Sequence, residues 1–270
     1  MRLINVRPSR RTGLFLACLP FIALLVAYAI GSAVRLEANP ADKLLPGFQT
    51  IADAVNTYAF TQDRRTGDYL LWADTQASLT RLVSGLGIAT AIALVVGVAQ
   101  GVLPLARAAL APLVGFISMV PPLALLPVLF IALGLGETAK IALIVIGVTP
   151  ILIRDLALQA GALPREQIIK AETLSASSWL ITLRVVLPQV LPRLIDSLRL
   201  QLGPAFLFLI AAEAISADAG LGYRIFLVRR YMSMDVIFPY VAWITLLAVV
   251  MDVALSQLRR RAFPWTEIRQ

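Results

Sequence analysis

The sequence predicts an all-α, polytopic membrane protein with about six transmembrane helices. Hydrophobic residues make up 59% of the 270 residues and charged residues only 15%. The mean hydropathy of +0.82 also separates the chain from ordinary soluble domains. A hydrocarbon core about 30 Å thick needs about 20 mostly apolar residues per helix, and the chain has room for roughly six such segments. Arginines flank the first and the last of these segments, as expected at cytoplasmic ends.

The apolar segments define the predicted spans. The first is long enough to be a retained helix, although Arg10-Arg11 before an apolar run resembles the start of a signal peptide. The second contains glycines spaced for close packing between helices, namely Gly85, Gly87, Gly97 and Gly101. The six spans, in this order along the chain, are predicted at residues 13–34, 79–103, 110–133, 141–158, 195–215 and 236–258.

Charge sets the predicted orientation. The net charge is +8, and no acidic residue accompanies the arginines before the first span, which are Arg2, Arg7, Arg10 and Arg11. Three arginines at 259–261 follow the last span, so both termini are expected on the cytoplasmic side. The predicted regions are an N-terminal tail (1–12), a transmembrane domain (13–258) with a periplasmic segment (35–78) and a cytoplasmic loop (159–193), and a C-terminal tail (259–270). Ile51, Val55 and Tyr58 recur at helical spacing and predict a short interfacial helix within the periplasmic segment.

Several kinds of chemistry are excluded by composition. The chain has no His and one Cys, which excludes Ser-His triads, His-ligated metals and intrachain disulfides. The closest approach to a phosphate-binding loop, at residues 134–140, has the wrong spacing. We therefore expect a non-catalytic subunit without a metal or cofactor of its own, and any ATP that drives it must bind another chain.

A polar stretch over residues 164–179 separates the fourth and fifth spans and is too long to be a simple connector. Pro164 fits the first position of a helix, and Glu166 complements the helix dipole. Small residues at 175–178 predict a tight turn. A second short helix is expected to follow and to end at Leu187-Pro188. Such an exposed tip suits docking in a groove of another protein.

This stretch resembles the EAA loop of bacterial ABC-importer permeases, whose pattern is Glu-Ala-Ala, three residues, Gly, nine residues and Ile-x-Leu-Pro. Ser175 stands at the Gly position, and residues 185–188 match the end in register. Ala171 matches the second Ala, whereas Ile169 replaces the Glu and Lys170 the first Ala. Glu166 and Glu172 each lie three residues from Ile169, so either could offer a carboxylate on roughly the same helix face.

The resemblance extends beyond the loop. Residues 119–127, which contain Pro121-Pro122, and residues 134–140 resemble the third span and connector of the nitrate, sulfonate and taurine branch of these permeases, and so do residues 212–215 with 220–225. Residues 66–74 and 226–231 resemble permeases associated with urea-carboxylase and guanidine metabolism.

The resemblance implies a permease subunit of the bacterial inner membrane that imports a small polar solute of the nitrate, sulfonate and taurine type or the urea and guanidine type. Its implied partners are a second permease subunit in a homodimer, two ABC ATPases that carry ATP and Mg, a periplasmic or lipid-anchored solute-binding protein, and membrane lipid, but no nucleic acid. The implied coupling residues are Ala171, Glu172, Leu174, Ser175, Ala176 and Ser177, with Leu187 and Pro188 fixing the return to the membrane. The alternative for these residues is an ordinary amphipathic surface loop.

A translocation path is the remaining expectation. Pro121 and Pro122 remove backbone donors and should kink or unwind the third span, either along a solute path or as a purely structural kink. Glu213 would be costly in its apolar setting without a partner, so it should contact a solute or hold the turn at residues 220–223; we favour the turn. Glu137 and Lys140 should form a surface pair.

Two other classes of membrane protein compete with the permease interpretation. A self-contained secondary transporter should have several ionisable groups or broken helices at midmembrane, and it would leave the polar loop unexplained. An intramembrane enzyme would lack an evident catalytic set, because the chain has no His and no paired carboxylates on one span.

Overall fold

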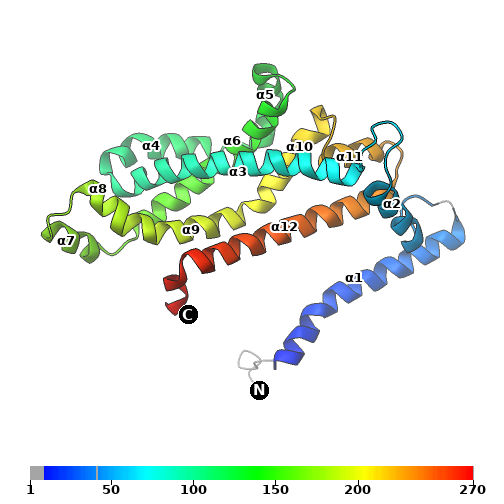
Figure 1. The fold of residues 1–270 in the computed structure, drawn as a ribbon, viewed down its shortest axis with the longest axis horizontal. Coiled ribbons are helices and arrows are strands. Elements are labelled where there is room, and N and C mark those ends of the chain that lie inside the picture. Colours follow the sequence, from blue (N-terminus) through cyan, green and yellow to red (C-terminus); the bar gives the residue numbers. More distant parts are fainter. Residues whose placement is uncertain (1–8, 41, 270) are drawn as a thin grey trace. The chain divides into compact units, whose positions relative to one another are not determined.

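The computed structural model describes residues 9–40 and 42–269, which form helices joined by short loops (Figure 1). Arg2 and Arg7 lie outside the described residues. The chain divides into two compact units, one formed by Met1–Tyr69 with Val228–Tyr240 and the other by Leu70–Leu227 with Val241–Gln270.

The first unit contains α1 (Arg10–Ala38) and α2 (Phe48–Phe60). The hydroxyl of Ser9 caps α1 by accepting a hydrogen bond from the Thr12 N–H. Two side chains of α1 hold the connecting loop, because the hydroxyls of Tyr28 and Ser32 both donate to the Pro46 carbonyl. The short helix predicted after the first span is confirmed as α2.

The second unit is built on α3 (Leu70–Val102) and α6 (Glu137–Gly161), which pack closely. A Cβ on Gly97 would lie 2.8 Å from the Leu156 Cβ, and one on Gly101 would lie 2.3 Å from the Ala160 Cβ. Gly85 approaches Ile144 in the same way, whereas Gly87 faces open space. Three of the four predicted glycine contacts therefore let the two backbones come together.

Substituting Gly97 by leucine is expected to force α3 and α6 apart. Overpacking of this kind costs about 1–3 kcal/mol, and thermal unfolding of the purified protein in detergent measures the loss. Gly87→Leu is the matched control, because it adds the same side chain to the same helix where nothing lies within 4 Å. Equal losses of stability in the two variants would contradict close packing at Gly97.

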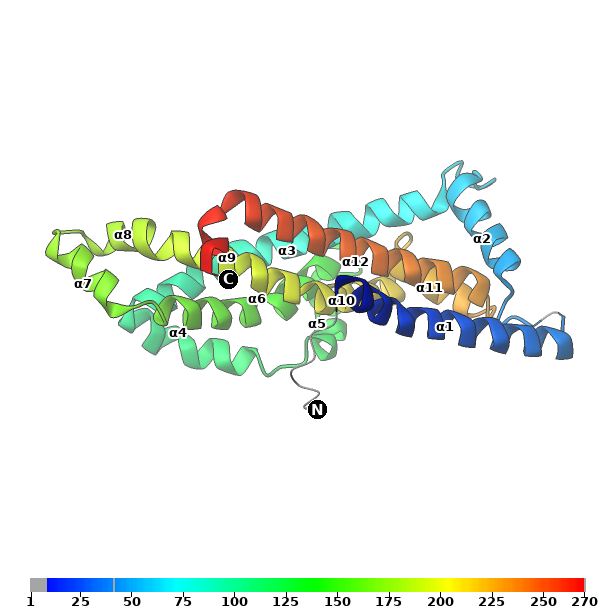
Figure 2. The ribbon, with the colours of Figure 1, turned by 90° about the horizontal axis from the view of Figure 1, so that it is seen from below.

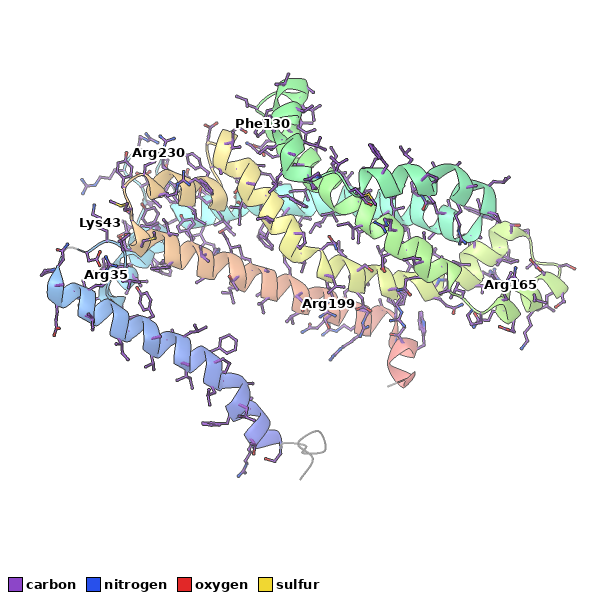
Figure 3. All side chains as sticks on the ribbon, turned by 180° about the vertical axis from the view of Figure 1, so that it is seen from behind. Arg35, Lys43, Phe130, Arg165, Arg199 and Arg230 are labelled. Carbon is purple, nitrogen blue, oxygen red and sulfur yellow. The ribbon has the colours of Figure 1, made fainter. Side chains whose placement is uncertain are left out.

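The prolines break the third predicted span. Helix α4 (Pro104–Ile117) is followed by a short 3-10 turn, η2 (Pro122–Leu125), and by α5 (Leu126–Leu133), with a bend of 80° between the two parts. Pro121 and Pro122 lie at the start of η2, where their missing N–H groups cost no helical hydrogen bond. The predicted unwinding is confirmed; Phe130 on α5 marks the redirected segment (Figure 3).

The remaining helices depart from the prediction at two places. Helix α8 (Ser178–Ile181) continues through a π-helical turn (Thr182–Val186) into α9 (Leu187–Leu200), so Leu187-Pro188 does not end a helix. The wider π turn accommodates the ring of Pro188, which would clash with the preceding turn of a regular helix. The fifth predicted span is also interrupted, because Gln201 separates α9 from α10.

Beyond this break, α10 (Leu202–Ser216) and α11 (Leu221–Arg229) are bent by 55° at the intervening turn. Helix α12 (Met234–Ala262) and a 3-10 turn, η4 (Pro264–Arg269), complete the described residues. Among the described residues, five helices are long and apolar enough to cross a membrane, and the number of spans rises to as many as seven if each bent pair counts as one. The predicted six spans fall within this range.

Candidate functional site

Two parts of the second unit contain the predicted functional residues other than Pro121 and Pro122: the loop at 159–193, which contains the implied coupling residues and is here called the coupling loop, and the turn near Glu213. The coupling loop forms one end, where α7 (Arg165–Thr173) leads into α8 (Figure 2). Figure 3 labels Arg165 at this end. A turn between α10 and α11 lies away from it, toward the opposite end of α3 (Figure 1).

Residues 171–177, here called the tip, reverse the chain between α7 and α8. Ser175 has a φ of 60°, in the left-handed region, which glycine adopts at least cost. This conformation explains why Gly occupies the matching position of the EAA pattern. On the far side of the turn, the Ser177 hydroxyl caps α8 by accepting a hydrogen bond from the Leu180 N–H. Pro164 was predicted at the first position of α7, but it is the N-cap residue and α7 begins at Arg165.

One face of the loop packs against the helix bundle. Ile168, Ala171 and Ala176 contact a buried apolar cluster. The cluster combines residues of α3, α6, α8 and α9 with the π turn: Val98, Leu156, Ala160, Ile181, Val186, Val190 and Leu194. Ala171 and Ala176 thus place the tip in contact with a cluster that includes residues of α3, α6 and α9.

The opposite face is exposed and apolar. Leu174 at the tip is 83% exposed, and Trp179 and Ile169 are also exposed. Glu172, Ser175 and Ser177 are exposed beside them. A cavity of about 550 Å³ lies between the loop and the ends of α3, α4 and α6, with Glu172 and Arg107 in its lining. The predicted coupling residues therefore divide into a face that packs on the bundle and a face that is open to a partner.

Ser175→Val is expected to disorder the tip, because a β-branched residue in the left-handed region costs about 1–2 kcal/mol. Ser175→Gly should retain the turn within about 1 kcal/mol. Hydrogen–deuterium exchange of amides 171–177 measures both effects. Equal protection of the tip in the two variants would show that the backbone of Ser175 does not need this conformation.

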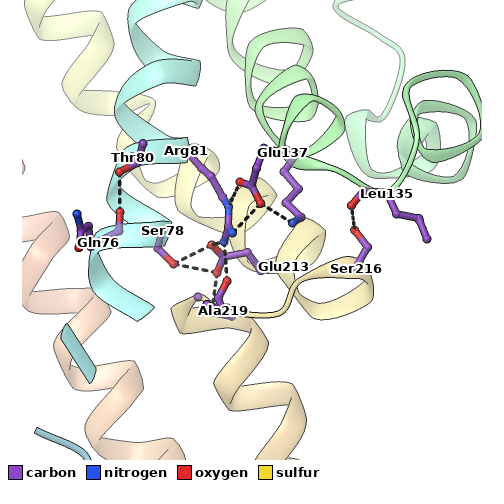
Figure 4. Close-up of polar contacts among 12 residues, drawn as sticks. Gln76, Ser78, Thr80, Arg81, Leu135, Glu137, Glu213, Ser216 and Ala219 are labelled. Carbon is purple, nitrogen blue, oxygen red and sulfur yellow. Dashed lines mark hydrogen bonds and ion pairs between the residues drawn. The ribbon is translucent and has the colours of Figure 1, made fainter. Parts of the chain in front are cut away.

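The second site surrounds the turn between α10 and α11 (Figure 4). Three successive backbone N–H groups at the start of α11 each donate to a side chain: Gly220 to Asp74 at 2.9 Å, Leu221 to Ser78 at 2.8 Å and Gly222 to Glu213 at 2.8 Å. Gly220 has a φ of 141°, and a Cβ there would lie 2.6 Å from the Glu213 carboxyl carbon. Glycine is therefore required for the turn to close over Glu213.

Arg81 joins this turn to two other helices. Its Nη1 donates to Glu213 at 2.6 Å and to the Ala219 carbonyl at 2.8 Å. On its other side, Nε and Nη2 both donate to the Glu137 carboxylate at the start of α6. Lys140 donates to the same carboxylate at 2.9 Å. We call Asp74, Ser78, Arg81, Glu137, Lys140 and Glu213 the turn cluster.

The expected contact between Glu213 and the glycine turn is confirmed, since Glu213 is fully buried and bonded to Gly222, Ser78 and Arg81. The predicted pair of Glu137 and Lys140 is confirmed, but its surface position is wrong for Lys140, which is buried.

Asp74, Ser78 and Arg81 were not predicted as site residues. Asp74 and Ser78 fell in the predicted periplasmic segment of mixed charge, but α3 begins at Leu70. A helical signal was present nonetheless, because positions 74, 78 and 81 share one face of a helix. That face meets the turn. Pro121 and Pro122 are not part of the turn cluster, so their place on a translocation path stays a prediction.

Comparisons with known proteins show the family of this chain. Residues 85–264 match the family of binding-protein-dependent transport system inner membrane components. The chain is 35% identical over 222 residues to the taurine transport system permease protein TauC of Escherichia coli (strain K12), covering 82% of this chain and 80% of that protein. A probable ABC transporter permease protein of Brucella abortus is 33% identical over 261 residues, covering 96% and 98%.

A bicarbonate transport system permease protein, CmpB of Synechocystis, is 29% identical over 243 residues, covering 89% of this chain and 85% of that protein. Among solved structures, a chain of the inward-facing MetNI methionine ABC transporter superposes with a TM-score of 0.63 at 21% identity. It covers 74% of this chain and 99% of that one, which shows a shared fold. With this fold, this loop and these relatives, the chain belongs to the family of binding-protein-dependent transport system inner membrane components and is a multi-pass permease subunit of an ABC importer.

Proposed function

We propose that this permease imports a small polar solute that a periplasmic or lipid-anchored solute-binding protein delivers, and that partner ATPases drive import through the coupling loop. The observation that carries the proposal is the two-sided loop. Ala171 and Ala176 pack on the bundle while Leu174 is exposed at the tip. A partner that grips Leu174, Ser175 and Ser177 can thus move α3, α6 and α9 as one group.

The proposed assembly is a homodimer of permeases with two ATPases on the cytoplasmic side. ATP and Mg would be held by the ATPases, and this chain would perform no chemistry itself. Both termini and the coupling loop would then face the cytoplasm. Leu187 and Pro188, at the start of α9, would fix the return of the loop to the membrane.

The solute class follows from two relatives. Taurine has a sulfonate group and bicarbonate is itself an oxyanion, so we propose a small solute with an oxyanion group. Urea or guanidine is the alternative. Thermal-shift screening of the solute-binding protein with nitrate, sulfonates, bicarbonate, urea and guanidine distinguishes these solutes, because bound ligand stabilises a folded protein.

Co-purification tests the coupling role. The permease should purify with a P-loop ATPase, and proteoliposomes containing the complex should take up solute only with ATP. Deleting residues 167–178 should abolish uptake and release the ATPase. Normal ATP-dependent uptake by the deletion variant would contradict the coupling assignment.

A further inference from the structure

In the turn cluster, the donor groups of Arg81 and Lys140 are arranged as they would be to bind an anion, and the carboxylate of Glu137 occupies that position. Three donor atoms converge on the Glu137 carboxylate: Nε and Nη2 of Arg81, the latter at 2.9 Å, and Nζ of Lys140 at 2.9 Å. A planar guanidinium beside an ammonium group matches the oxygens of a carboxylate, a sulfonate or a bicarbonate equally well.

Burial separates this carboxylate from the other members of the cluster. The side chains of Arg81 and Lys140 are 7% and 4% exposed, and Glu213 is fully buried, whereas Glu137 is 57% exposed. Asp74 is paired with Arg224. Two buried cations therefore face one buried carboxylate, and an exposed side chain supplies the second negative charge.

Buried charges must be compensated, but the group that compensates them need not belong to the chain. Withdrawal of Glu137 into solvent would leave Nε and Nη2 of Arg81 and Nζ of Lys140 directed at one place. The Glu213 bond to Arg81 uses a different nitrogen, Nη1, so it would remain intact. The turn would stay closed while an external anion replaced the Glu137 carboxylate.

We infer that Arg81 and Lys140 form a binding site for a small oxyanion, which Glu137 occupies as an internal substitute until a solute displaces it. The site lies at the start of α6, whereas Ala160 near the other end of α6 packs on the coupling loop. About 30 Å of helix separates Lys140 from Ala160. If the coupling loop faces the cytoplasm, the site lies at the periplasmic end of α6, which a delivered solute would reach first. This last step rests on the proposed function and its orientation.

Binding of potassium methanesulfonate tests the inference, with the permease in nanodiscs together with its ATPase subunits. Glu137→Ala is expected to raise the affinity for methanesulfonate at least about tenfold. In the unsubstituted protein the Glu137 carboxylate fills most of the sites, so the apparent affinity is the intrinsic affinity multiplied by the small fraction of sites that are open. Titration calorimetry at constant ionic strength measures it. Bicarbonate should show the same gain, and guanidinium should show none.

Glu166→Ala is the matched control, because Glu137 and Glu166 are both exposed carboxylates in the first turn of a helix. Adding Lys140→Met to Glu137→Ala removes both partners of one ion pair and should abolish the gain in affinity for methanesulfonate. A methanesulfonate affinity in Glu137→Ala no higher than in Glu166→Ala would overturn the site. An unchanged gain after Lys140→Met would also overturn it.

The measurement uses neither ATP nor a binding protein, so its result is independent of coupling. Anion binding without ATP-driven uptake would contradict the proposed function but support the anion site. ATP-driven uptake without the gain in affinity would contradict the anion site but support the proposed function.

Discussion

Arg81→Met is expected to be among the most destabilising single substitutions in this chain. Glu213 is fully buried and would keep its bonds to Ser78 and Gly222 but lose its cationic partner. Breaking a buried ion pair from one side costs about 3–5 kcal/mol, because a charge remains without compensation. Thermal unfolding in detergent should show the loss, and proteolysis should increase at the turn between α10 and α11.

Arg199→Met provides the matched control. Arg199 pairs with Asp252 at 2.8 Å, but both side chains are partly exposed, so the same substitution should cost about 1 kcal/mol or less. Restoring the charge balance should also recover stability: Arg81→Met combined with Glu213→Gln should be more stable than Arg81→Met alone. A double variant that is no more stable than the single one would show that the charge of Glu213 is not the cause.

The turn cluster illustrates what a single sequence conceals. Glu213 could be singled out because a carboxylate in an apolar run needs a partner. Its partners on α3 could not be named, since Arg81 is 132 positions away and Ser78, 135 positions away, lies just before the second predicted span. A hydropathy window ends where polar residues begin, yet α3 is about 50 Å long and continues beyond the hydrocarbon core.

The coupling loop was more predictable because its signals are local. A proline, a small-residue turn and helical spacing lie within 25 residues, and α7 and α8 follow from them. The π turn before Pro188 was missed, because proline ordinarily indicates a helix end. Which face of the loop is buried also depends on α3 and α6, so the separate roles of Ala171 and Leu174 emerged only with the fold.

Leu174→Asp is expected to reduce ATP-driven uptake by at least about thirtyfold while leaving the helix bundle folded. An apolar side chain that fills a pocket of a partner contributes about 2 kcal/mol or more to binding, and this corresponds to about thirtyfold in affinity. Leu174 is 83% exposed in this chain, so its replacement removes no internal packing. Uptake into proteoliposomes, ATPase activity of the complex and the Tm of the permease together measure the effect.

Thr173→Asp separates the loss of the apolar contact from the added charge. Thr173 is the last residue of α7, next to Leu174, and it is exposed, so the same carboxylate is introduced without removing an apolar anchor. If Leu174 docks in the ATPase, Thr173→Asp should retain most of the uptake. Equal losses in the two variants would assign the effect to charge, and the exposed apolar face of the loop would then not be the surface that the ATPase grips.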